Sequence, residues 1–155
     1  MALIHDFYLV SKDATLKNDL MGYMDSIKEF AVAHVKINDD LILYMADTIN
    51  WVPSKNTPFT RRFHEMGLDY YGITIFDENS ITILKDVLLG WRMIFASAPK
   101  VITLTGMYVE GDDEEDGEYE KNTFDQDEVL QQFDALIALI VEVEKHSHKI
   151  YHIGI

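Results

Sequence analysis

The densest group of chemically capable side chains lies between Glu110 and Glu120, a segment with eight acidic residues and no basic ones. Four residues match positions 1, 3, 5 and 6 of the twelve-residue calcium loop of an EF-hand: Asp112, Glu114, Asp116 and Gly117. Position 12 requires a glutamate and is Thr123, and the flanking residues favour strands rather than helices. We therefore expect no calcium site, but a loop that is either solvated or faces a partner.

The six histidines do not form a recognisable metal-binding pattern. His146 and His148 are two residues apart, a spacing that places them on different sides of a helix but on one face of a strand. His64 and Glu65 begin a His-Glu-x-x-His pattern, but the residue at its last position is Leu68. Surface or helix-capping roles are therefore the expectation for the histidines.

No catalytic motif is present in the sequence. There are no cysteines, no Gly-x-Ser-x-Gly nucleophile turn, and no glycine-rich phosphate loop. Arg61, Arg62 and His64 lie near Trp51 in the sequence, where they would form either an anion site or the solvated face of a helical turn. We therefore predict no catalytic, cofactor-binding or metal-binding residue, and no cofactor.

The net charge points to a class of partner. The chain has 27 acidic and 13 basic residues, a formal net charge of −14. Such a surface repels nucleic acid and anionic lipid and attracts basic proteins. The residues predicted to face a protein partner are Asp112, Asp113, Glu114, Glu115, Asp116, Glu118 and Trp51, the last because it lies next to Pro53 and is expected to be partly exposed.

The elements that would position these residues are arranged around a strand, helix and strand at Tyr71–Phe76, Ser80–Ala96 and Lys100–Gly106. The helix has an apolar stripe at helical spacing, formed by Leu84, Val87, Leu88, Trp91, Ile94 and Phe95, which predicts a sheet beneath it. Pro99 ends this helix, because proline lacks the backbone N–H that a helix needs.

Periodicity predicts the remaining elements on either side of this unit. Before it we expect a strand at 3–10, a helix capped by Ser11 or Asp13, a strand at 35–37, and a helical turn at 61–66 stopped by Gly67. The segment 41–52 suits either a short helix or an extended strand, and we favour a helix from Leu41. After it we expect a hairpin strand at 119–124, a helix capped by Asp125 and ending near Lys145, and a strand at 150–155. The apolar run 135–141 in the last helix implies either deep burial or contact with a second copy of the chain.

Alternating strands and helices predict an α/β fold with a mixed sheet of about four to six strands and three main helices. An α+β layout with all helices on one face is the alternative. The length of 155 residues predicts one domain, 1–155. His5 and Asp6 interrupt any signal-peptide apolar region, and cysteines are lacking, so we expect a cytoplasmic protein.

Several short segments resemble small immunity proteins of bacterial polymorphic toxin systems. They are Gly67-Leu-Asp-Tyr-Tyr-Gly-Ile-Thr74, Trp91 ahead of Ala98-Pro99, Leu104-Thr-Gly106, and His152-Ile-Gly-Ile155. The resemblance implies a protein that remains in the cytoplasm of the producing cell and blocks a cognate toxin by binding it. It carries over no site residue.

Three classes of function follow: a toxin-neutralising binding protein, an acidic housekeeping or scaffolding domain, and a small-molecule-binding protein or enzyme. A neighbouring gene for a toxin with a variable C-terminal domain would favour the first class. A deep polar pocket with several perturbed titratable groups would favour the third.

Overall fold

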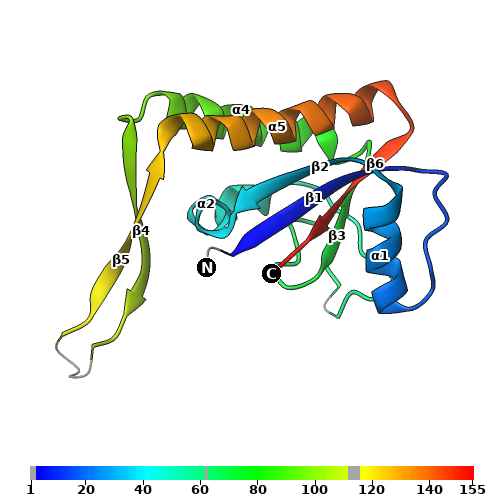
Figure 1. The fold of residues 1–155 in the computed structure, drawn as a ribbon, viewed down its shortest axis with the longest axis horizontal. Coiled ribbons are helices and arrows are strands. Elements are labelled where there is room, and N and C mark those ends of the chain that lie inside the picture. The colour runs from blue at the N-terminus through cyan, green and yellow to red at the C-terminus, as the bar shows by residue number, and fades with distance from the viewer. Residues whose placement is uncertain (1–2, 62, 112–115) are drawn as a thin grey trace.

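The computed structural model describes residues 3–61, 63–111 and 116–155, and its main element is a four-stranded sheet (Figure 1). The strand order is β2-β1-β6-β3, with bounds β1 (Ile4–Ser11), β2 (Ala31–Asn38), β3 (Ile73–Phe76) and β6 (His148–Ile153). Each neighbouring pair is antiparallel, so the expected mixed sheet is wrong in this respect. The C-terminal strand is central, because it pairs with both β1 and β3.

Helices cover both faces of this sheet, which confirms a fold that combines helices and strands (Figure 1). The two long helices, α4 (Ile81–Ala96) and α5 (Gln126–Lys145), pack against each other over one face. The third main helix, α1 (Leu20–Phe30), packs on the opposite face. Two short helices, α2 (Asp39–Tyr44) and α3 (Ala46–Ile49), follow β2 directly. None of the described helices is both long and apolar enough to cross a membrane.

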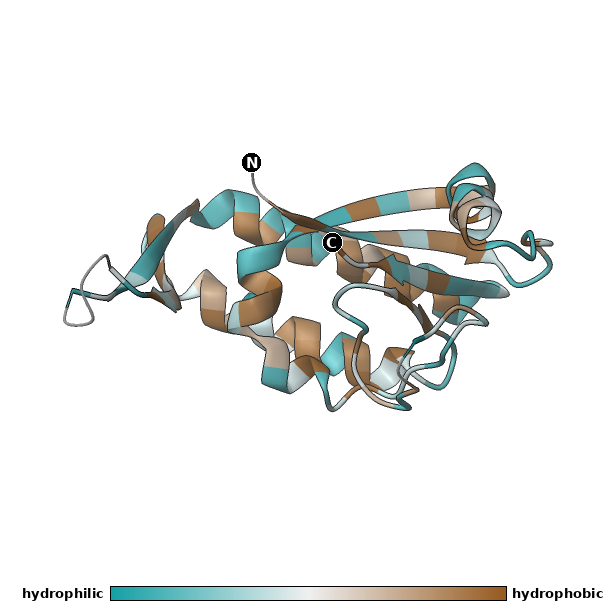
Figure 2. Ribbon diagram, turned by 90° about the horizontal axis from the view of Figure 1, so that it is seen from below, coloured by the Kyte–Doolittle hydropathy of each residue, from teal (hydrophilic) through white to brown (hydrophobic). Residues whose placement is uncertain are grey.

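Alternation along the strands creates a separate hydrophobic core on each face. Phe7 and Leu9 of β1 belong to the core under α4 and α5, whereas Tyr8 and Val10 belong to the core under α1. Hydrophobic residues, drawn brown, recur along the strands in Figure 2. The apolar run 135–141 of α5 contributes Leu136, Leu139 and Ile140 to the first core. Burial within the chain therefore accounts for this run, and contact with a second copy stays a prediction.

A second sheet is a hairpin of β4 (Val101–Val109) and β5 (Glu118–Asp125), which projects from the end of the α4–α5 pair (Figure 1). It confirms the hairpin expected at 119–124, but β4 does not join the strand before α4 in one sheet. Gln126 fixes the base of the hairpin, because its Nε2 atom lies 2.7–3.0 Å from carbonyl oxygens at the C-terminal end of α4, those of Phe95, Ala96 and Ala98. Asp125 caps α5 as predicted, accepting hydrogen bonds from the backbone of Asp127 and Glu128.

Three local predictions are wrong. The cap of α1 is Asp19 rather than Ser11 or Asp13, so the helix begins later than expected. The segment 61–66 has no helical turn among its described residues; Met66 instead forms an isolated bridge with Pro53, and Arg62 lies outside the described residues. Ile94 is 62% exposed, which makes the buried stripe of α4 narrower than predicted. Its central residue, Trp91, is 2% exposed as expected.

Candidate functional site

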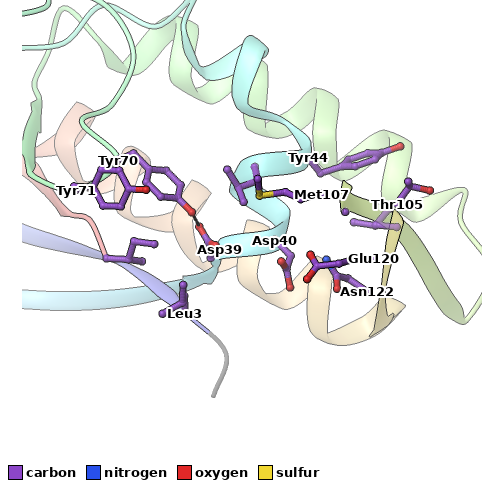
Figure 3. Close-up of a pocket in the computed structure, with 14 residues that line it drawn as sticks. Leu3, Asp39, Asp40, Tyr44, Tyr70, Tyr71, Thr105, Met107, Glu120 and Asn122 are labelled. Atoms are coloured by element: carbon purple, nitrogen blue, oxygen red, sulfur yellow. Dashed lines mark hydrogen bonds between the residues drawn. The ribbon is translucent and has the colours of Figure 1, made fainter. Parts of the chain in front are cut away.

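A pocket of about 720 Å³ lies between the hairpin and the body of the protein (Figure 3). One wall comes from the middle of the hairpin strands, with Met107 and Glu120, and the other from α2 and the turn at Tyr70 and Tyr71. Leu3 and Ile155 bring both described chain ends to its edge. The pocket therefore joins segments from the whole length of the chain.

Carboxylates from two elements meet in this pocket. Asp39 and Asp40 form the first turn of α2, where Asn38 fixes the turn by accepting a 2.9 Å hydrogen bond from the backbone N–H of Asp40. Glu120 reaches the same space from β5, and Figure 3 shows its side chain beside that of Asp40. Burial, the charge of Asp39 and the charge of Glu120, in that order, raise the pKa of Asp40. The described residues that line the pocket include no lysine, arginine or histidine, so none of them offsets this negative charge.

Asp39 also ends a chain of buried hydrogen bonds. Its Oδ1 atom accepts a 2.5 Å hydrogen bond from the hydroxyl of Tyr70 and lies 2.9 Å from Nε2 of His5. The other ring nitrogen of His5, Nδ1, lies 2.8 Å from Nε2 of His152. This series of hydrogen bonds thus connects the pocket wall with the paired strands β1 and β6.

The carboxylate fixes the direction of these hydrogen bonds. Because Asp39 only accepts, Nε2 of His5 carries a hydrogen, and Nδ1 of a neutral His5 then accepts from Nε2–H of His152. This leaves Nδ1 of His152 as a bare lone pair, and that atom has no partner among the described residues. Burial is the main cause that holds the pKa of His152 well below its usual value, and repulsion from His5 adds to it whenever the His5 ring is protonated. His152 is 0% exposed, so a proton on Nδ1 would be a buried and unpartnered donor.

The position of Tyr70 depends on the C-terminal residues. Gly154 donates a 2.8 Å hydrogen bond to the carbonyl of Gly72, and Ile155 donates a 3.2 Å bond to the carbonyl of Tyr70. A Cβ atom on Gly154 would lie 2.0 Å from the Tyr70 carbonyl oxygen, so only glycine permits this approach. Burial first, and then hydrogen bonding to the Asp39 carboxylate, raise the pKa of Tyr70 and keep its hydroxyl a donor.

The predicted partner-facing residues occupy two separate places. Asp116 and Glu118 are exposed on the hairpin, while Asp112, Asp113, Glu114 and Glu115 lie outside the described residues. Trp51 follows α3 and is 62% exposed, as expected. No described hydrogen bond or aromatic pair joins Trp51 to the hairpin. Within the described residues, no group of three histidines or carboxylates is arranged to hold a metal ion.

No sequence pattern identifies His5, Asp39, Tyr70 and His152 as a group. Asp39 is not singled out by the sequence, and His5 is noted only as an interruption of an apolar run. A period of two puts His5 on the same face of β1 as Phe7, and His152 on the same face of β6 as Ile150, and both positions point to the core. That pattern marks two buried histidines, but their contact depends on the register of β1 with β6.

The arrangement suits binding of a cation. It offers a fixed carboxylate, two further carboxylates and three tyrosines around one concave space. Comparison of the chain with protein-family models, with curated proteins and with solved structures gives no match.

Proposed function

We propose that this chain is a cytoplasmic immunity-type protein that neutralises a basic protein toxin by direct contact and has no catalysis of its own. The observation that carries the proposal is the acidic hairpin, which projects beyond the helices and presents Asp116 and Glu118 to solvent (Figure 1). A projecting element meets an approaching partner before the rest of the surface does. Its charge therefore has a large effect on the rate of encounter.

The charge of the whole chain acts in the same direction. The formal net charge is −14, and the pocket beside the middle of the hairpin strands contains the carboxylates of Asp39, Asp40 and Glu120. Opposite charges steer association over about one Debye length, roughly 8 Å at physiological ionic strength. A basic protein would thus be drawn toward the end of the molecule that carries the hairpin.

Exposed apolar side chains beside these acids provide contact area after encounter. Tyr44, Tyr71 and Met107 line the pocket and are exposed. Aromatic residues and methionine are enriched in the cores of protein interfaces, where their burial supplies most of the affinity. A charged hairpin above an aromatic pocket thus combines steering with anchoring.

The proposal is tested with the product of a neighbouring toxin gene. Co-expression of this chain should restore growth of a bacterial host that makes the toxin, and the two proteins should elute as one complex in gel filtration. The double variant Asp116→Lys/Glu118→Lys should weaken the complex. The charge-matched control Asp25→Lys/Glu29→Lys changes exposed residues on α1, at the opposite end of the molecule. This control should leave the affinity of the complex unchanged. Absence of both rescue and complex would favour the housekeeping or small-molecule alternatives.

A further inference from the structure

We infer that the pocket between the hairpin and α2 is a receptor for an arginine side chain of the protein partner. This inference rests on the proposed function and specifies the chemistry of the anchor. Its walls are α2, the Tyr70–Tyr71 turn and the middle of the hairpin strands, and its lining does not include the hairpin residues Asp116 and Glu118 (Figure 3).

One carboxylate oxygen of Asp39 has no hydrogen-bond partner among the described residues. Asp39 is only 6% exposed, and its Oδ1 atom already accepts from Tyr70 and faces His5. Its Oδ2 atom receives none of the hydrogen bonds found among the described residues. That atom is also not one of the fully buried unpartnered atoms, so it opens into the pocket that Asp39 lines. An accessible oxygen on an otherwise buried carboxylate can accept a hydrogen bond from water or from a ligand that enters the pocket.

The composition of the pocket wall suits a planar cation. Tyr44, Tyr70 and Tyr71 line the same pocket as the carboxylates, and Met107 and Leu43 add apolar surface. A guanidinium group is planar, stacks on aromatic rings, and donates two parallel hydrogen bonds to a carboxylate. An ammonium group is a compact and strongly hydrated charge that uses neither the flat walls nor the paired acceptors. Among the described residues, no three histidines or carboxylates are arranged to hold a metal ion.

The raised pKa of Asp40 also favours binding of a cation in this pocket. Burial and the neighbouring charges of Asp39 and Glu120 raise its pKa, so the empty pocket disfavours the charged carboxylate. A bound guanidinium would favour that charged form and so lower the pKa of Asp40. Linkage requires the converse as well, so that affinity for the cation rises as Asp40 deprotonates.

The test needs no protein partner. N-acetyl-arginine-amide is titrated into the ¹⁵N-labelled full chain, with N-acetyl-citrulline-amide as the neutral probe of the same shape. We expect saturable shifts confined to the pocket for the arginine probe, and none for the citrulline probe. Asp40→Asn should weaken binding about tenfold, because a charge-assisted hydrogen bond is lost. Asp86→Asn removes the same charge from an exposed site on α4 and should bind as wild type does.

Two results would overturn the inference: non-saturable shifts, or equal weakening by Asp40→Asn and Asp86→Asn. Tyr44→Ala, which removes one stacking wall, provides a second variant if Asp40→Asn does not fold, and Tyr44→Phe is its matched control. Tyr44→Ala should weaken binding while Tyr44→Phe retains it, and equal affinities would also overturn the inference. Failure here leaves the steering role of the hairpin intact, whereas a toxin that does not bind leaves the arginine pocket intact, so the two proposals fail separately.

Discussion

Acidification should destabilise this protein through His152. The pKa of His152 lies well below its usual value in the folded state, because the ring is fully buried next to His5. In the unfolded chain a histidine titrates near 6.5. Between those two values the unfolded state binds more protons than the folded state, so the free energy of unfolding falls as pH falls.

The size of the effect follows from this difference in proton binding. Well below pH 6.5, a histidine that stays neutral in the folded state costs about 1.4 kcal/mol of stability per pH unit. From about pH 8 to about pH 5 the loss amounts to about 2 kcal/mol. Such a loss is a substantial fraction of the roughly 5–15 kcal/mol that stabilises a typical domain.

Urea unfolding over this pH range measures the effect in wild type and in His152→Gln. The glutamine amide donates from a position close to that of Nε2 but does not titrate, so the variant should lose about 2 kcal/mol less than wild type. His146→Gln, an exposed histidine at the end of α5, is the matched control and should follow wild type. Parallel stability curves for wild type and His152→Gln would refute the assigned hydrogen-bond chain.

Three further perturbations test the packing and the interface. Trp91→Ala should cost about 3–5 kcal/mol in urea unfolding, because the ring is buried against Phe133 and its Nε1 donates a 2.8 Å hydrogen bond to Thr48; a mutant as stable as wild type would contradict this packing. Gly154→Ala should cost about 1–3 kcal/mol and shift the NMR signals of the pocket, since the new methyl group would meet the Tyr70 carbonyl; unchanged signals would show that Tyr70 is positioned otherwise. Trp51→Ala should leave stability unchanged, because the side chain is exposed. It should raise the dissociation rate of the toxin complex about tenfold or more, because an aromatic anchor is lost. A change in the association rate alone would show that Trp51 is not an anchor.

Much of the fold follows from local sequence patterns. The stripe of α4, the Asp125 cap and the strand at the C-terminus are all encoded within a few residues, and the structure places elements at these positions. The partners of the strands are not encoded locally. The antiparallel order β2-β1-β6-β3 depends on contacts between distant segments, whereas β4 pairs with β5, the next strand in the sequence.

The same reasoning explains why the candidate site was missed. His5, Asp39 and His152 come from three distant segments, and each looks ordinary beside its sequence neighbours. Only the register of β1 with β6 and the start of α2 after β2 bring their side chains within hydrogen-bonding distance. By contrast, Trp51 and the hairpin acids were predictable as exposed, because a residue next to proline and a run of like charges rarely lie in a core.

The central claim is that acidic residues steer a basic toxin to the hairpin end of the molecule. Stopped-flow association with the neighbouring toxin, from about 0.1 to about 1 M salt, tests it most directly, because the Debye length falls from about 10 to about 3 Å over that range. The account predicts an association rate that falls steeply with salt, and a slower rate for Asp116→Lys/Glu118→Lys with little change in dissociation. An association rate that is independent of salt, or equal for this variant and wild type, would contradict it.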